Sequence, residues 1–236
     1  MEGLTFFIGL IGNIISVLVF LSPVPTFWRI VKNKSTEDFE CVPYVCTLLN
    51  SSLWTYYGII KPGEYLVATV NGFGILVESI YVLLFLIYAP TMMRNKTGAL
   101  FGALDLGFLA AVVLVTQLAL KGEIRLDVLG VVCAGLNIIM YGSPLAAMKT
   151  VVSTKSVEFM PFWLSFFLFL NGGVWAFYAV LVRDYFLLVP NGIGFLLGAA
   201  QLLLYVIYRN SAKPKKNTAS SGLEEQQREP LIISVD

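Results

Sequence analysis

The stretch LNSSLWTYYG, residues 49–58, places a polar amide inside an apolar run, with Trp54 one helical turn after Asn50. The chain repeats this arrangement 121 residues later in LNGGVWAFYA, residues 170–179, where Trp175 follows Asn171 by the same four positions. Residues four apart share a face of an α-helix, so each copy sets an amide beside an indole ring. Burying an amide without a partner costs about 2–7 kcal/mol, and we therefore expect both copies to face polar groups or water.

The composition around the two copies is typical of a membrane protein. Of the 236 residues, 57% are hydrophobic and only 13% are charged, whereas soluble domains carry about 25% charged residues. A helix that crosses a bilayer needs about 20 mostly apolar residues. We predict an all-α membrane protein with seven transmembrane helices, at residues 4–27, 42–60, 65–89, 98–120, 126–148, 161–183 and 185–208. Residues 210–236 are polar and are predicted to form a disordered cytosolic tail.

The sequence does not indicate several other classes of function. Its formal net charge is only +1, which gives no reason to expect a nucleic-acid partner. Three cysteines and no histidine provide no metal-ligand spacing. No combination of residues typical of a soluble enzyme is present, so we predict a protein that is not an enzyme and that uses no cofactor and no metal.

The lysines and arginines predict how the helices are oriented, because these residues concentrate on the cytosolic side of membrane proteins. Eleven of them follow the first, third, fifth and seventh spans, and only four lie on the opposite side. The N-terminus is therefore predicted to be luminal or extracellular, and the C-terminus cytosolic.

The repeat covers three helices in each half of the chain. A shift of 121 residues superposes Tyr57 on Tyr178, and a shift of 120 superposes Asn71 on Asn191. The span at 98–120 has no counterpart, so four helices separate equivalent positions and the halves enter the membrane in the same direction. Parallel repeats of this kind place a pathway at their interface. We predict two parallel three-helix repeats joined by a linker helix (3+1+3), at residues 1–90, 91–124 and 125–209.

The repeated residues suit a sugar pathway. The asparagines form two symmetric pairs, Asn50 with Asn171 and Asn71 with Asn191. An amide both donates and accepts hydrogen bonds, as sugar hydroxyls do, and an indole ring packs against the C–H face of a sugar ring. We therefore expect a mono- or disaccharide partner, although a hydrogen bond between helices would also explain Asn50.

The interior acids favour transport driven by the sugar gradient alone. Glu78 and Asp105 are the clearest interior ionisable residues, and neither has an acidic counterpart in the other half. Transporters coupled to protons or sodium usually carry a buried carboxylate in the pathway. Facilitated transport is therefore predicted, with proton coupling through Glu78 as an alternative.

Four prolines are the predicted moving parts. Pro23 and Pro144 lie near the cytosolic ends of equivalent helices, and Pro43 and Pro161 begin the helices that follow. A proline inside a helix removes one backbone hydrogen bond and kinks the helix, which a bundle tolerates beside a cavity. For Pro43 and Pro161, a simpler role as first-turn helix starters explains the sequence equally well.

Three segments suggest a family. They are LSPVPTFWRIVKNKST (21–36), TVVSTKSVEFMPFWLSFFLFLNG (150–172) and LVPNGIG (188–194), and they closely resemble the SWEET (MtN3/saliva) family of eukaryotic sugar transporters. The resemblance covers residues 1 to about 209. It implies a 3+1+3 architecture, bidirectional sugar uniport by alternating access, and a homo-oligomer in the lipid bilayer.

The resemblance also implies which residues act. It implies a central sugar site at Trp54, Asn71, Trp175 and Asn191. One turn below this site it implies size-selective positions at Val19, Asn50, Met140 and Asn171. It implies a cytosolic gate formed by the four prolines, and an opposite gate at Tyr57, Tyr178 and Asp184.

Within the family, SSLWTYYGIIKPGEYLVATVNGFG (51–74) is most similar to the plant clade of the vacuolar membrane, which is associated with fructose and glucose. We therefore expect hexoses as substrates and the vacuolar membrane as the location, with the plasma membrane as the alternative. Two other classes of function stay open. One is a seven-helix sorting receptor, and the other is a proton-coupled transporter of another small solute.

Overall fold

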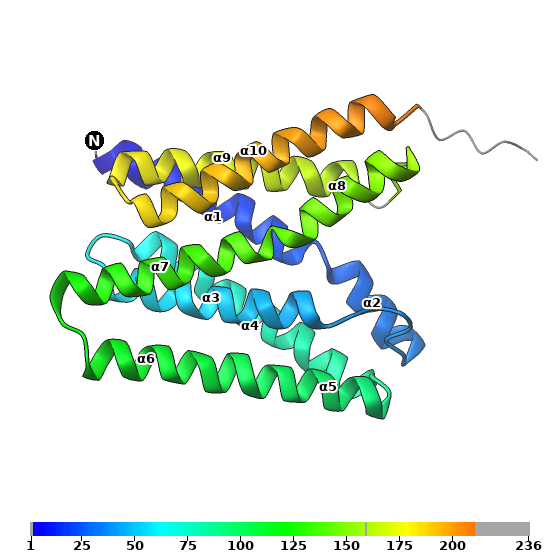
Figure 1. Cartoon of the computed structure of the whole chain (residues 1–236), viewed down its shortest axis with the longest axis horizontal. Coiled ribbons are helices and arrows are strands. Elements are labelled where there is room, and N and C mark those ends of the chain that lie inside the picture. Colours follow the sequence, from blue (N-terminus) through cyan, green and yellow to red (C-terminus); the bar gives the residue numbers. More distant parts are fainter. Residues whose placement is uncertain (1, 159, 211–236) are drawn as a thin grey trace, which may run out of the picture.

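The regular structure of the described chain is helical. The computed structural model describes residues 2–158 and 160–210, and its helices lie mostly along one long axis (Figure 1). The helical segments are α1 (Glu2–Leu21), α2 (Val24–Asn33), α3 (Val42–Ile60), α4 (Tyr65–Tyr88), α5 (Thr91–Phe101), the π-helical η1 (Gly102–Phe108), α6 (Leu109–Leu118), α7 (Gly122–Met140), α8 (Gly142–Thr154), α9 (Phe162–Val182) and α10 (Tyr185–Tyr208). The predicted disordered tail, from residue 211 onward, lies outside the described residues.

These segments form seven helical runs, one for each predicted span. α1 and α2 make one run that breaks at Ser22 and Pro23, α5, η1 and α6 are continuous, and α7 meets α8 at Tyr141. Within the described residues, six of the runs are long and apolar enough to cross a membrane. The seventh is α3, which has the predicted bounds of 42–60 but a more polar composition.

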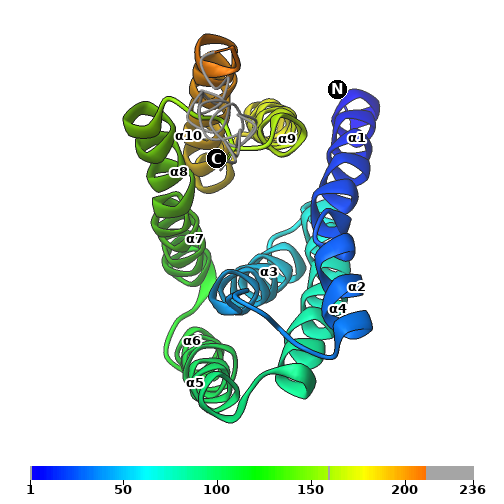
Figure 2. The ribbon, with the colours of Figure 1, turned by 90° about the vertical axis from the view of Figure 1, so that its right-hand side faces the viewer.

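α3 can be polar because protein encloses it. Figure 2 shows α3 between α4, α6 and α7, and these three helices all pack against it. A helix covered in this way needs little apolar surface for lipid, so it can carry hydroxyls and an amide at positions such as Thr47, Asn50 and Ser51. The burial of α3 thus explains why the opening stretch departs from an ordinary membrane helix.

The two halves pack on each other symmetrically. α1 of the first half packs against α9 of the second, and α7 of the second half packs against α3 of the first. Because α1 corresponds to α7 and α3 to α9, these are the same contact made twice. The α5–η1–α6 run lies outside this arrangement, against α3 and α4 (Figure 2). The predicted 3+1+3 order of helices is therefore what the structure has.

Three runs are longer than the predicted spans. The first run continues to Asn33 instead of residue 27, the linker run begins at Thr91 instead of 98, and α8 continues to Thr154 instead of 148. The ends at Asn33 and Thr154 are equivalent in the two halves. A lysine in left-handed conformation follows each of them: Lys34 (φ 51°) and Lys155 (φ 56°). Hydropathy shows where the apolar residues stop, whereas these helices continue past that point and end at a left-handed backbone turn.

The four prolines lie where helices begin or break. Pro23 is the N-cap of α2, and Pro161 is the N-cap of α9. Pro43 is in the first turn of α3, and Pro144 is in the first turn of α8. A proline in the first turn removes no helical hydrogen bond, so Pro43 and Pro161 are compatible with a role as helix starters.

Candidate functional site

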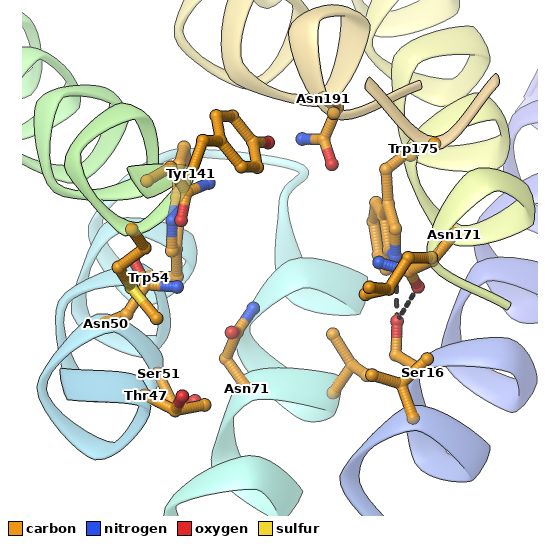
Figure 3. Close-up of a pocket in the computed structure, with 18 of the residues that line it drawn as sticks. Ser16, Thr47, Asn50, Ser51, Trp54, Asn71, Tyr141, Asn171, Trp175 and Asn191 are labelled. Carbon is orange, nitrogen blue, oxygen red and sulfur yellow. Dashed lines mark hydrogen bonds between the residues drawn. The ribbon is translucent and has the colours of Figure 1, made fainter. Parts of the chain in front are cut away.

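A cavity of about 320 Å³ lies between the two halves. This volume is within the range of about 300–1,000 Å³ that is usual for small-molecule sites. All eight residues predicted to contact sugar line it: Val19, Asn50, Trp54, Asn71, Met140, Asn171, Trp175 and Asn191. Figure 3 shows Trp54 and Trp175 on opposite sides of the space, and Asn71 opposite Asn191. The structure thus brings together residues that are up to 172 positions apart in the chain.

Asn71 and Asn191 are held in the same way in each half. The Asn71 Nδ2 donates to the Val67 carbonyl at 2.9 Å, and the Asn191 Nδ2 donates to the Leu187 carbonyl at 2.8 Å. Each bond uses one amide hydrogen and fixes the side chain along its own helix. The second amide hydrogen and the carbonyl oxygen of each residue stay available, so each half offers one donor and one acceptor to a ligand.

One wall of the cavity is tied by a hydrogen-bond chain. The Trp175 Nε1 donates to Ser16 Oγ at 2.9 Å, and Ser16 Oγ donates to Asn171 Oδ1 at 2.6 Å. Gly12 makes room for this ring, because a Cβ added there would lie 3.0 Å from an indole carbon. The chain fixes the plane of the Trp175 indole against α1, as a stacking surface requires.

The opposite wall keeps polar atoms without partners. Among the described residues, Asn50 Oδ1 and Ser51 Oγ are buried and bonded to nothing. A buried acceptor without a donor is costly, and a sugar hydroxyl at this wall would satisfy it. The two equivalent amides therefore differ in this structure: the carbonyl oxygen of Asn171 accepts a hydrogen bond from protein and that of Asn50 does not.

The residues of the predicted outer gate lie at the ends of α3 and α9 and before α10, and all are buried. The Tyr57 hydroxyl donates to Asp184 Oδ2 at 2.9 Å, and the Tyr178 hydroxyl donates to Glu64 Oε2 at 3.0 Å. The two tyrosines are equivalent at a shift of 121, and the two acids are equivalent at a shift of 120. The tyrosine of each half therefore donates its hydrogen bond to the acid of the other half. We use the name outer gate for these four residues, all of which are at most 3% exposed.

Lys61 makes the two gate bonds unequal. Its Nζ lies 2.6 Å from Asp184 Oδ2 and donates to the Tyr57 hydroxyl at 3.0 Å. Asp184 also caps α10 by accepting from the backbone N–H groups of Phe186 and Leu187. Glu64 is the N-cap residue of α4, but its side chain makes no cap bond, and among the described residues its carboxylate has only the Tyr178 hydroxyl as a hydrogen-bond partner. Burial raises the pKa of the Glu64 carboxyl to about 7, and the Asp184 carboxylate adds to this.

Glu64 is an acid that the sequence analysis did not single out. The prediction concerned Glu78 and Asp105, which have no acidic counterparts, whereas Glu64 and Asp184 occupy equivalent positions at a shift of 120. Their residue types differ and the shift changes from 121 to 120 between Tyr57 and Asn71, so this pair was not recognised. The cavity itself has no carboxylate among the described residues that line it.

Glu78 and Asp105 do not line the cavity. Glu78 is 3% exposed in α4, and Asp105 is 6% exposed in η1. One oxygen of Glu78 and both oxygens of Asp105 have no hydrogen-bond partner in the described chain. Their position gives no support to a proton path through the cavity.

The end of the bundle opposite the outer gate has fewer links between the halves. Of the four predicted gating prolines, only Pro144 lines the cavity. Among the described residues, every hydrogen bond and ion pair between the two halves lies at the cavity or on the outer-gate side of it. In this conformation the hydrogen bonds and ion pairs of the described chain tie the halves together at the outer-gate end of the cavity and not at the opposite end.

Sequence reasoning missed several polar residues of the site. Ser16 and Asn137 occupy equivalent positions at a shift of 121, and both line the cavity. Tyr141 and Gln201 also line it, but they are not equivalent to each other. Identity between the halves was the signal used, and none of these residues is identical to its counterpart. Their place in amphipathic helices beside Val19 and Met140 is the sequence signal that could have found them.

Comparison with known proteins identifies relatives along the whole bundle. The family model MtN3_slv, described as "Sugar efflux transporter for intercellular exchange", matches residues 6–93 and again residues 127–213. The chain is 59% identical over 233 residues to "Bidirectional sugar transporter SWEET17" of Arabidopsis thaliana, with 98% of this chain and 97% of that protein covered. It is 62% identical over 213 residues to "Bidirectional sugar transporter SWEET16" of the same plant, with coverage of 89% and 92%.

A solved structure has the same architecture. "The 3.7 A resolution structure of a eukaryotic SWEET transporter" superposes with a TM-score of 0.83 at 42% sequence identity. The superposition covers 88% of this chain and 98% of that one. The seven-helix fold is thus shared with an experimentally determined relative.

Proposed function

The chain belongs to the MtN3/SWEET family of sugar transporters, and on that premise we propose that it carries hexoses such as fructose and glucose across a membrane in both directions, by facilitated uniport. The observation that supports the sugar site is the two-fold cavity itself. It presents two indole rings and two anchored amides to one space of about 320 Å³. Flat apolar faces beside paired donors and acceptors match the C–H faces and hydroxyls of a sugar ring.

Uniport is supported by the uncharged lining. Coupling to protons needs a group in the pathway that takes up a proton from one side of the membrane and releases it to the other. No carboxylate lines the cavity in the described chain, and Glu64 and Asp184 belong to the outer gate, where a proton exchanges with one side only. The sugar gradient alone then drives the flux.

Alternating access follows from the two ends of the cavity. The outer gate is held by two crossed hydrogen bonds and an ion pair. Breaking these contacts separates α3 and α9 from the starts of α10 and α4. The proline-bounded breaks at Pro23 and Pro144 are where the cytosolic halves of the first and fifth runs bend to close the opposite end.

The deciding experiment is sugar flux in proteoliposomes. We expect uptake of labelled fructose or glucose that does not change when the pH gradient is abolished at constant pH on the outer-gate side. Asn71→Ala and Asn191→Ala remove donors and acceptors from the cavity and should abolish uptake while leaving the protein monodisperse. Asn95→Ala is the matched control, because Asn95 is an exposed helical residue of α5 outside the cavity.

Two results would overturn the proposal. Uptake that collapses without a pH gradient would establish a proton-coupled transporter instead. Saturable sugar binding without net flux would establish a receptor. A panel of hexoses and sucrose in the same vesicles identifies the preferred substrate.

The remaining proposals concern the setting of the molecule. We place the chain in the vacuolar membrane, with a luminal N-terminus and a cytosolic C-terminus, as a homo-oligomer with its repeat boundaries near residues 90 and 125. The distribution of lysines and arginines and the similarity of residues 51–74 to the vacuolar clade support this. Protease protection of tags at either end of the chain in intact vacuoles tests both location and orientation.

A further inference from the structure

The cavity departs from two-fold symmetry at a polar corner of the second half, in addition to the difference between Asn50 and Asn171. In the second half, Tyr141 lies over Gly194, and a Cβ added at Gly194 would be 2.6 Å from the Tyr141 hydroxyl oxygen. In the first half, the ring of Phe20 lies over Gly74 in the same way, with Phe20 Cζ 2.5 Å from such a Cβ. The shifts of 121 and 120 relate these two contacts. The rings therefore pack alike, and the hydroxyl is the difference.

The Tyr141 hydroxyl is oriented by a backbone group. It donates to the Pro190 carbonyl at 2.6 Å, which commits its only proton. Val70 stands at the position equivalent to Pro190, so the first half has neither the hydroxyl nor the proline. With the proton fixed, the oxygen of Tyr141 can act toward a ligand only as an acceptor.

The committed hydroxyl faces the cavity beside Asn191. Tyr141 and Asn191 both line the cavity, and Figure 3 shows the Tyr141 hydroxyl pointing toward the Asn191 amide. The remaining Asn191 amide hydrogen is a donor, and the Tyr141 oxygen is an acceptor. In the corresponding corner of the first half, Asn71 lies beside the apolar Phe20, and the hydroxyl there is that of Ser51, which has no hydrogen-bond partner among the described residues.

We propose that Tyr141 is a specificity-determining residue of the sugar site, whose hydroxyl oxygen accepts a hydrogen bond from one hydroxyl of the bound sugar. A sugar ring has no two-fold symmetry, so a symmetric pocket would bind it in two opposite orientations equally well. The Tyr141–Asn191 corner favours the orientation that places a hydroxyl against α7 and α10. This inference rests on the proposed sugar transport and assigns one contact within it.

The test uses deoxy-sugars as competitors of labelled glucose uptake in proteoliposomes. The competitors are glucose and its 2-, 3-, 4- and 6-deoxy analogues. In the wild type, the analogue that lacks the hydroxyl bound by Tyr141 should compete about 2- to 10-fold less well than glucose, as expected for one neutral hydrogen bond. In Tyr141→Phe, the same analogue should compete as well as glucose, because the acceptor is gone.

Tyr81→Phe is the matched control. The Tyr81 hydroxyl also donates to a backbone carbonyl, that of Phe20, at 3.0 Å, but Tyr81 does not line the cavity. This variant should keep the wild-type order of competitors. If Tyr141→Phe is not recovered in folded form, Gly194→Ala replaces it, because the added methyl group displaces the hydroxyl.

Two results would overturn the assignment. One is a Tyr141→Phe protein that keeps every wild-type ratio between the deoxy-sugars, and the other is the same loss of discrimination in Tyr81→Phe. Absence of glucose uptake by the wild type is a different outcome, which contradicts the proposed function and not the assignment of Tyr141.

Discussion

Replacing Glu64 by glutamine should remove a pH dependence from the outer gate. In the closed gate, burial raises the pKa of the Glu64 carboxyl to about 7 from an ordinary 4.5. The groups that face this carboxyl are the Tyr178 hydroxyl, the Asp184 carboxylate and the Lys61 ammonium. In an open gate the carboxyl is in water and returns to its ordinary pKa.

The sign of the effect follows from where the proton binds more tightly. The closed gate has the higher pKa, so protonation favours closure. This stabilisation is fully present below pH 4.5 and is lost as the pH rises through 7. Between pH 5.5 and pH 8 it changes by about 2 kcal/mol, or about 25-fold in the closed-to-open ratio, by proton linkage. Glutamine is neutral throughout and keeps the hydrogen-bond acceptor, so Glu64→Gln should stay as firmly closed at pH 8 as at pH 5.5.

The native thiol of Cys133 reports the opening. Cys133 is 0% exposed and belongs to the same buried cluster as Tyr57 and Tyr178. With Cys41 and Cys46 replaced by alanine, the rate of its modification by a membrane-impermeant reagent at the outer face measures the open fraction. The reactivity of any thiol rises with pH, and this rise affects both proteins equally. The quantity compared is therefore the rate of Cys133 modification in the protein with Glu64 divided by the rate in Glu64→Gln. We expect this ratio to rise about 25-fold from pH 5.5 to pH 8. A ratio that is constant with pH would refute the reasoning.

Three further substitutions test the packing around the site. Asp184→Asn leaves Lys61 without its buried partner and should destabilise the closed gate by about 3–5 kcal/mol, seen as faster labelling at the outer face. Ser16→Ala breaks the hydrogen-bond chain between Trp175 and Asn171 and should lower the free energy of unfolding by about 1–3 kcal/mol. The same protein should bind sugar more weakly. Unchanged thermal unfolding and unchanged affinity would contradict a positioning role for Ser16. Gly58→Ala should lower the unfolding temperature, because its Cβ would lie 2.6 Å from a backbone nitrogen of α4, whereas Gly72→Ala, with open space around it, should not.

The fold was predictable because the membrane restricts the answer. Seven apolar spans, a repeat of identical residues and short connections leave one simple arrangement, and the seven runs in order 3+1+3 confirm it. The break at Pro23 was expected from the proline alone. The length of the first run was not, because it ends at the left-handed turn of Lys34, which hydropathy does not report.

The site was predictable only where the halves agree. Asn71 and Asn191 stood out because the repeat preserves them, and the structure places both on the cavity. Ser16 could not be inferred in this way, since its role depends on Trp175, which is 159 residues away in the chain. Tyr141 was invisible for the opposite reason. Its importance lies in a difference between the halves, whereas the comparison of the halves looked for identity.

The crossed hydrogen bonds of the outer gate illustrate a difference between a duplicated chain and a dimer of identical units. In a dimer of identical three-helix units, a change in the tyrosine or in the acid would alter both crossings at once. Fusion into one chain lets each crossing vary alone. Lys61 has no cationic counterpart, since Leu181 and Val182 stand at the corresponding positions. One crossing is therefore reinforced by an ion pair, while the other, through Glu64, is expected to respond to the acidity of the compartment that it faces. Two copies of a single gene product cannot divide these tasks.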